Sequence, residues 1–164
     1  MKKVLLLIII AVTSVYASAQ NTSSSAITID SLSARLEKLQ QDYDYLLCDF
    51  ELYRIKAEQN ELLQDINIKT NAILLDIYNS SYNRDIYSAY LDNYNINCAL
   101  FDSQKEKYER TKQFIKLKTV TSDFSDIQLS KIELTFKSFD NGIAAVNAVL
   151  KYYKFLLDTY RDKR

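Results

Sequence analysis

The sequence predicts an all-α protein in which long antiparallel helices form a three-helix or four-helix bundle or a coiled-coil hairpin. Long runs of apolar residues at alternating spacings of three and four carry this prediction, because that spacing lines one helix face. The 164 residues include no proline and one glycine, so the turn formers of a β-sandwich or barrel are missing. Hydrophobic residues make up 48% of the chain, which excludes a disordered protein.

The chain begins with a segment typical of an export signal. Lys2 and Lys3 precede an almost wholly apolar run, and Ala17-Ser18-Ala19 fits the small-residue pattern at which signal peptides are cleaved. The apolar run is shorter than the ~20 residues of a membrane-spanning helix. We therefore expect cleavage after Ala19 and no stable membrane insertion afterwards.

Cleavage there would leave three parts: a signal peptide over residues 1–19, a flexible polar entry over 20–27, and one helical bundle domain over 28–164. The leader, with Gln20 directly after the cleavage site, resembles leaders of exported proteins of the Bacteroidota. This resemblance concerns targeting only and implies a periplasmic or secreted location. Since the leader removes two lysines and no acid from a chain of net charge zero, the mature chain would carry a charge of −2.

The first helix is predicted over residues 28–79 and carries two apolar stripes. The first stripe has heptad a and d spacing and comprises Ile29, Leu32, Leu36, Leu39, Tyr43, Leu46, Phe50, Tyr53 and Ala57. The second stripe comprises Cys48, Leu52, Ile55, Leu62, Ile66, Ile73 and Ile77. Two stripes predict contact with more than one neighbour, so either the neighbour changes along the helix or the helix bends near residues 57–60.

The second helix is predicted over residues 83–118. It follows a cluster of turn formers from Asn79 to Asn83. Lys105 and Lys112 interrupt its apolar stripe, so we expect partial exposure toward its C-terminal half. The stripe itself comprises Tyr87, Leu91, Tyr94, Cys98, Phe101, Tyr108 and Ile115.

The third helix is predicted over residues 123–162, opened either by Ser122 or by Ser125 in a capping box with Gln128. Asp140-Asn141-Gly142 resembles a turn, but the apolar stripe keeps its phase across it. One continuous helix is therefore expected, with Gly142, Ala145 and Ala148 allowing close approach of a neighbour. The stripe comprises Leu129, Ile132, Phe136, Phe139, Ile143, Val146, Leu150, Tyr153, Leu157 and Tyr160.

The predicted lengths conflict with full burial of the first stripe. At ~1.5 Å per residue the first helix would measure roughly 75 Å and the second about 50 Å. The N-terminal part of the first helix would then expose its stripe, and an exposed apolar stripe indicates a partner. Either the first helix folds back near residue 60 or 70, or the protein associates with itself.

Two cysteines in an exported chain suggest a disulfide between Cys48 and Cys98. A bend at Ser81 argues against it, because the two residues would then differ in height by ~24 Å, whereas a disulfide holds its Cα atoms within roughly 7 Å. The bridge requires a reversal near residue 73, with a break in residues 65–71. The alternatives are two buried thiols or an intermolecular bridge.

The composition excludes several kinds of chemistry. The absence of histidine removes the usual general base and the commonest metal ligand. A single glycine cannot build a phosphate-binding loop, and zero net charge without a basic run argues against nucleic-acid binding. We therefore expect no enzyme, no catalytic or metal-binding residues and no cofactor. The basic end of the second helix is expected to face solvent opposite acidic residues of the first.

A cluster of tyrosine and asparagine around the first bend is the candidate binding patch, because such residues combine rigid rings with adaptable hydrogen bonding. The predicted function is a non-enzymatic interaction protein that binds an envelope or extracellular protein, a glycan or itself. A small periplasmic holdase chaperone and a secreted inhibitor or immunity-type partner are the alternatives. The patch comprises Tyr78, Tyr82, Tyr90, Asn79, Asn83 and Asn93.

Overall fold

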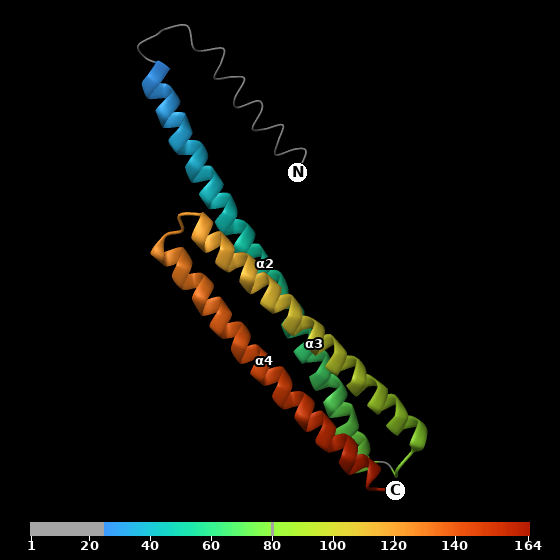
Figure 1. The fold of residues 1–164 in the computed structure, drawn as a ribbon. Coiled ribbons are helices and arrows are strands. Elements are labelled where there is room, and N and C mark those ends of the chain that lie inside the picture. Colours follow the sequence, from blue (N-terminus) through green and yellow to red (C-terminus); the bar gives the residue numbers. More distant parts are fainter. Residues whose placement is uncertain (1–24, 80) are drawn as a thin grey trace. The chain divides into compact units, whose positions relative to one another are not determined.

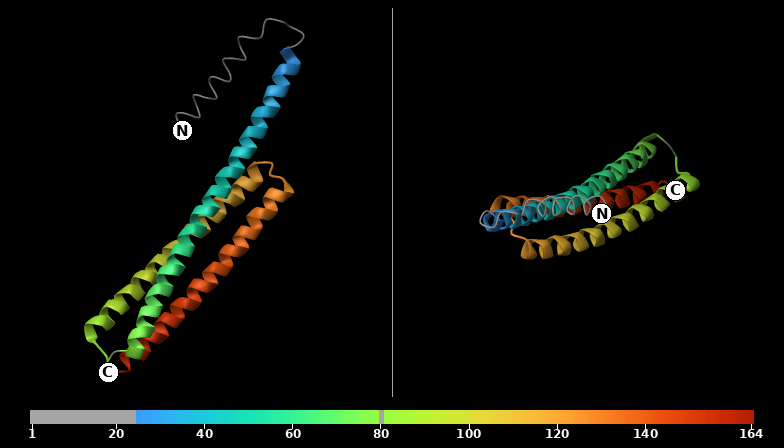
Figure 2. Two further views of the ribbon diagram at one scale, coloured as in Figure 1. Left: turned by 180° about the vertical axis from the view of Figure 1, so that it is seen from behind. Right: turned by 90° about the horizontal axis from the view of Figure 1, so that it is seen from above.

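The computed structural model describes residues 25–79 and 81–164, with side chains described from residue 28 onward. It contains three helices, α2 (Ser25–Asn79), α3 (Arg84–Thr121) and α4 (Asp126–Arg161) (Figure 1). Residues 44–164 form one compact unit, in which the three helices pack side by side (Figure 2). No strand occurs in the described ranges. The predicted all-α three-helix bundle is confirmed.

The N-terminal predictions are only partly covered by the structure. The signal peptide over residues 1–19 and residues 20–24 lie outside the described residues. Residues 25–27, which the sequence assigned to a flexible entry, already belong to α2.

Side-chain caps set the helix ends. Asn83 opens α3, since its side-chain oxygen accepts hydrogen bonds from the backbone N–H groups of Asp85 (2.9 Å) and Ile86 (3.2 Å). Ser125 opens α4 in the predicted capping box with Gln128. Ser122, the alternative cap, instead ends α3. These caps satisfy backbone groups that a helix end leaves without partners.

The core of residues 44–164 consists of two apolar clusters. One contains Cys48, Leu52, Ile55, Tyr108, Ile115, Phe124, Ile132 and Phe139. The other contains Leu62, Ile66, Ile73, Phe101, Val146, Leu150, Tyr153, Leu156, Leu157 and Tyr160. Ile143 packs against both clusters. The stripe predicted for the third helix therefore supplies side chains to the whole length of the core.

A buried amide, Gln59, sits against α4 in this core. Its side-chain nitrogen donates to the carbonyl of Phe139 (3.2 Å). It fills the space beside Gly142, where an added Cβ would come within 2.0 Å of the Gln59 Oε1 atom. The predicted close approach at Gly142 is thus confirmed, and α4 runs through this residue without a break. Ala148 is exposed, so the prediction was wrong for that residue.

The structure corrects the interpretation of the two stripes on α2. Only the second stripe is packed in the core of residues 44–164, whereas Leu46, Phe50, Tyr53 and Ala57 of the first stripe are exposed. The helix is not interrupted at residues 57–60, nor at 60–71. The expected change of neighbour was therefore wrong within residues 44–164, and no break of α2 separates the two stripes.

Helix geometry explains why one stripe stays outside. Leu46 and Cys48, Phe50 and Leu52, and Tyr53 and Ile55 are each two residues apart, which is about 200° around a helix. The two stripes consequently face nearly opposite directions. Since α3 and α4 both pack against the second stripe, nothing within residues 44–164 covers the first.

The prediction for α3 was wrong in its distribution of burial. The buried side chains Tyr108 and Ile115 lie in its C-terminal half, which was expected to be partly exposed, whereas the stripe residues Tyr87, Leu91 and Tyr94 of its N-terminal half are only half-buried. Lys105 lies over the Phe101 ring, 4.8 Å from its centroid, and Lys112 lies 5.1 Å from the centroid of Tyr108. The two lysines extend across the aromatic rings and keep their charges at the surface, so they do not interrupt packing.

The two cysteines are free thiols and belong to different regions of the core. Cys48 is fully buried in one cluster, and Cys98 is half-buried against the other. Because α2 is unbroken, the reversal near residue 73 that a bridge requires does not occur. The disulfide is therefore not formed in this structure, as the difference in helix rise indicated.

Candidate interaction surface

An apolar groove lies on the outer side of the bundle, between α2 and α4. Its lining includes Leu46, Phe50 and Tyr53 from α2, and Leu134, Thr135 and Ser138 from α4. The three α2 side chains are 62%, 61% and 74% exposed. Large apolar side chains that are this exposed and lie beside one groove mark an interaction surface, so they define the strongest candidate site.

Leu134 was not singled out by the sequence analysis. It is 67% exposed and lies off the apolar stripe of α4, between Glu133 and Thr135. The signal that would have found it is an isolated leucine on the polar face of an amphipathic helix. Only the packing of α4 beside α2 places it next to the first stripe.

Residues 28–43, considered separately, also carry exposed apolar side chains of the first stripe. Ile29, Leu36, Leu39 and Tyr43 are exposed, and Leu32 is partly exposed. They occupy the a and d positions of the heptads predicted from the sequence. Large side chains of the first stripe are therefore accessible both in this segment and in residues 44–164.

Charged side chains flank the groove within residues 44–164. Asp49 and Lys56 are part of its lining, and the Lys56 ammonium donates a hydrogen bond to the Ser138 hydroxyl. Neither Asp49 nor Lys56 forms an ion pair with another described residue within 4.0 Å. The groove thus carries one acid and one base beside its apolar floor.

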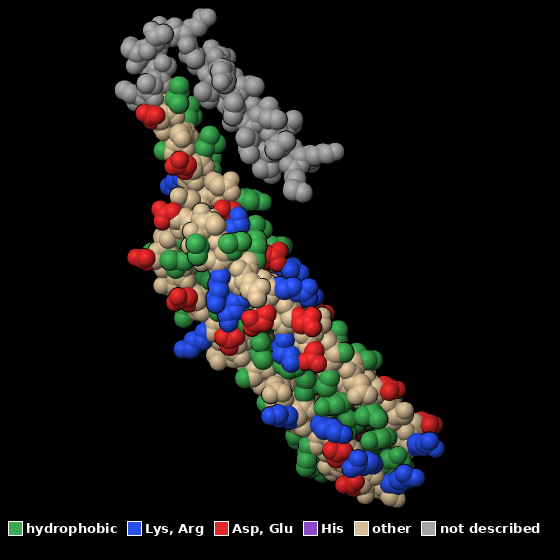
Figure 3. All heavy atoms as spheres, in the orientation of Figure 1, with side chains coloured by type: hydrophobic (Ala, Val, Ile, Leu, Met, Phe, Trp, Pro, Cys, Tyr) green, Lys and Arg blue, Asp and Glu red, His purple; other side chains and the backbone are tan. Residues whose placement is uncertain are grey.

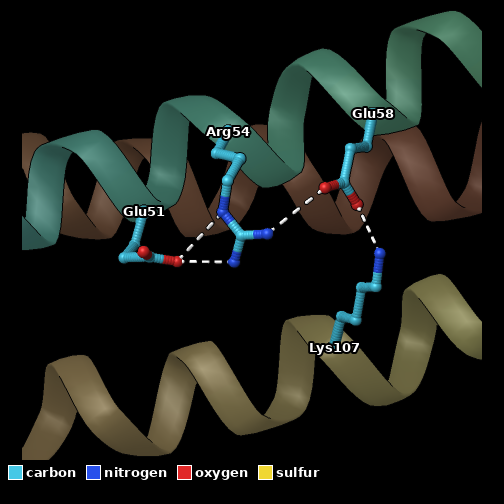
Figure 4. A network of polar contacts seen from close by, with 4 residues as sticks. All are labelled: Glu51, Arg54, Glu58 and Lys107. Carbon is cyan, nitrogen blue, oxygen red and sulfur yellow. Dashed lines mark hydrogen bonds and ion pairs between the residues drawn. The ribbon is translucent and has the colours of Figure 1, made fainter.

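A network of ion pairs links α2 to α3 (Figure 4). Arg54 contacts Glu51 (2.7 Å) and Glu58 (3.3 Å), and Lys107 of α3 contacts the other oxygen of Glu58 (3.0 Å). The hydrogen bond and charge of Glu51 raise the pKa of Arg54 above its usual value. These carboxylates are neutralised by neighbouring cations, which is the arrangement of a solvated helix face.

Asp44 forms the most buried polar contact between α2 and α3. Its side chain accepts hydrogen bonds from the Lys118 ammonium (2.9 Å) and the Ser122 hydroxyl (2.7 Å). Together with the Glu58–Lys107 pair, this confirms that basic residues of α3 lie opposite acidic residues of α2. Burial first, and the charge of Asp44 second, raise the pKa of the nearby Cys48 thiol. A raised pKa keeps this thiol protonated and unreactive.

The predicted tyrosine–asparagine patch is divided by the structure. The Tyr82 ring packs against Tyr160, with centroids 5.7 Å apart, and the Tyr90 hydroxyl donates to Asp76. Burial, with the Asp76 hydrogen bond next, raises the pKa of Tyr90. Asn83 is the cap of α3. These three side chains have structural contacts within the bundle.

The other members of that patch lie apart from such contacts. Tyr78 is 80% exposed at the C-terminal end of α2, and Asn79 beside it is also exposed. Asn93 is half-buried on α3. The structure therefore leaves one exposed aromatic ring where the sequence predicted a cluster, and the groove offers more accessible apolar surface.

The described residues contain no group of three or more histidine, cysteine or acidic side chains placed to hold a metal ion. No helix within residues 25–79 or 81–164 is both long and apolar enough to cross a membrane. Hydrophobic and charged side chains are intermixed over the face shown in Figure 3.

Comparison with known proteins gives no match, whether with protein-family models, curated proteins or solved structures.

Proposed function

We propose that this chain is a non-enzymatic interaction protein of the periplasm or the extracellular space, which binds another macromolecule through the first stripe of α2. The observation that carries the proposal is the exposure of Leu46, Phe50 and Tyr53, at heptad spacing, on a helix whose opposite face is fully packed. Exposed apolar patches of regular form are typical of binding surfaces.

The same observation favours this function over a holdase chaperone. A holdase chaperone needs a broad or adaptable apolar surface, whereas here the apolar side chains follow one helical line. An inhibitor or immunity-type partner would use a surface of the same kind, so it stays within the proposed class. Glycan binding rests on the tyrosine–asparagine patch, of which only Tyr78 presents an exposed ring.

Site-specific photocrosslinking in the cells that make the protein tests this function. A photoreactive amino acid replaces Phe50, and in a matched control it replaces Ile68, which is on the same helix and equally exposed at 61%. We expect covalent adducts at position 50 and few at position 68. Equal yields at both positions, or no adducts at position 50, would contradict the proposal.

Export is tested separately by sequencing the N-terminus of the protein recovered from the periplasm or medium. The predicted cleavage places Gln20 at the start of the mature chain. Recovery of the chain only from the cytosol, still beginning with residue 1, would contradict the predicted location.

A further inference from the structure

We propose that the occupant of this surface is a second copy of the same chain, which pairs with the first in parallel and in register through the first stripe of α2. This inference rests on the proposed function and names its partner. Three features support it: the exposed apolar area, the charges beside the stripe and the position of the bundle.

Large apolar side chains of the stripe are exposed in both units of the chain. They are Ile29, Leu36, Leu39 and Tyr43 in residues 28–43, and Leu46, Phe50 and Tyr53 in residues 44–164. Large apolar side chains that stay exposed at a regular spacing are typical of a surface that a partner covers.

The spacing of the stripe indicates a helix as its partner. Side chains that repeat every three and four residues form the seam of a coiled coil, where each fits between four side chains of the facing helix. The seam ends after Ala57, because the next positions of the same spacing are Asn60 and Gln64. A second copy of the helix carries the same apolar positions and also becomes polar after Ala57, so two seams aligned in register are apolar over the same residues.

The charges beside the seam favour the parallel arrangement. Asp49 and Lys56 occupy g positions, and Arg54 and Glu61 occupy e positions. In a parallel pair each g residue faces the e residue five positions later in the other helix. Asp49 therefore faces Arg54 of the second copy, and Lys56 faces Glu61 of the second copy. Both contacts are attractive, and each occurs twice in the dimer.

Antiparallel arrangements fit less well. Full antiparallel overlap of the stripe pairs Arg35 with Asp49 twice, but it brings the Asp42 residues of the two copies together, which is repulsive, and it leaves Lys56 without an acid across the seam. An antiparallel pair that matches Asp49 with Lys56 places residues 36–46 against a segment that includes the polar residues Asn60, Gln64 and Asn67. The parallel pair combines complete apolar overlap with four attractive charge pairs, because each of its two contacts occurs twice, and it brings no like charges together at the g and e positions. Since α3 and α4 pack against the opposite side of α2 within residues 44–164, they leave this side open.

The oligomeric state tests the proposal. The chain is produced with its own leader, purified, and studied by sedimentation equilibrium over about 1–100 μM, where we expect a dimer. Replacing two aromatic seam residues, Phe50→Ser with Tyr53→Ser, is expected to weaken dimerisation by on the order of 100-fold or more. The control pair Ile68→Ser with Leu75→Ser lies on the same helix and is expected to leave the dimer unchanged; its residues are each 61% exposed, against 61% and 74% for the seam pair.

Charge exchange tests the orientation without removing apolar surface. Glu61→Lys places two lysines opposite each other across the parallel seam and is expected to weaken dimerisation about tenfold. Adding Lys56→Glu to the same chain restores opposite charges and the affinity. In the antiparallel pair that matches Asp49 with Lys56, the double variant would stay repulsive, so a failure of rescue would overturn the parallel register.

A monomer throughout the concentration range, or equal weakening by the seam and control pairs, would overturn the proposal of a second copy. If circular dichroism shows that the variant with both seam substitutions does not fold, the charge-exchange variants decide whether a second copy is the partner. The failure of this inference is distinguishable from that of the proposed function. A monomer that still crosslinks at position 50 to a protein of different mass keeps the function and loses the second copy.

Discussion

Replacing Gly142 with alanine has an effect that depends on Gln59. An added methyl group would lie 2.0 Å from the Gln59 Oε1 atom, so the buried amide has to move. It then loses its hydrogen bond to the Phe139 carbonyl, which costs about 1–3 kcal/mol for a buried group. Alanine in place of glycine within a helix stabilises by about 1 kcal/mol. We expect Gly142→Ala to lower the free energy of unfolding by about 1 kcal/mol, which is the difference between these two effects.

The sign reverses when the amide is absent. In a Gln59→Ala chain nothing occupies the space beside Gly142, so Gly142→Ala is expected to stabilise by about 1 kcal/mol. The coupling between the two sites is then about 2 kcal/mol, which is typical of residues in direct contact. Urea denaturation of the parent, both single variants and the double variant measures it.

Asn141→Ala provides the control, because Asn141 is exposed on the same helix. Its effect on the free energy of unfolding is expected to be the same in the parent chain and in the Gln59→Ala chain. An equal change in stability from Gly142→Ala in both backgrounds would refute the coupling. That result would mean that the amide leaves this space without cost.

Three further predictions concern buried polar groups. Asp44→Ala is expected to destabilise the fold by about 1–3 kcal/mol in urea denaturation, because the Lys118 ammonium and the Ser122 hydroxyl lose their acceptor. A change below about 0.5 kcal/mol, which is the scale of surface substitutions, would contradict this. Burial raises the pKa of Tyr153 from 10.0 to about 12, so the stability that this residue contributes is present below pH 10 and is lost between pH 10 and 12. The urea midpoint should fall over that range, and less steeply in Tyr153→Phe. At about pH 8, Cys98 should be alkylated at least about tenfold faster than the buried Cys48, whose pKa is raised. Mass spectrometry of labelled peptides measures both rates, and comparable rates would contradict the burial of Cys48.

The sequence was sufficient for the elements and for much of the core. The unbroken phase from Phe139 to Ile143 predicted one helix through Gly142, and the Ser125–Gln128 pair predicted its cap, because both signals are local. The arithmetic of helix rise showed that a Cys48–Cys98 bridge and an unbroken first helix exclude each other, but it left the choice between them open. These predictions depend on one helix or on the length of a helix, and neither requires knowledge of how neighbours pack.

Burial of the α2 stripes required the tertiary structure. Both stripes are apolar, and only the packing of α3 and α4 on one side decides which of them is covered. The interaction of Lys105 and Lys112 with aromatic rings was missed for a similar reason, since a lysine in an apolar stripe looks like an interruption. Tyr82 and Tyr90, assigned to a binding patch, instead contact Tyr160 and Asp76, which are far away in the sequence.

The regularity of the exposed residues separates α2 from the other helices. On α3 the exposed apolar residues Ile96 and Leu100 are divided from Phe114 and Leu117 by Lys107 and Arg110. Isolated apolar side chains of this kind are common on protein surfaces and need no partner.

On α2 a polar residue does not interrupt the spacing between Ile29 and Ala57, although the bundle of residues 44–164 does not use this stripe. A side chain at the surface has no packing reason to keep a helical period. A partner that is itself a helix supplies such a reason, because its side chains meet the stripe at the same period. The uninterrupted spacing therefore supports helical pairing independently of the exposed area.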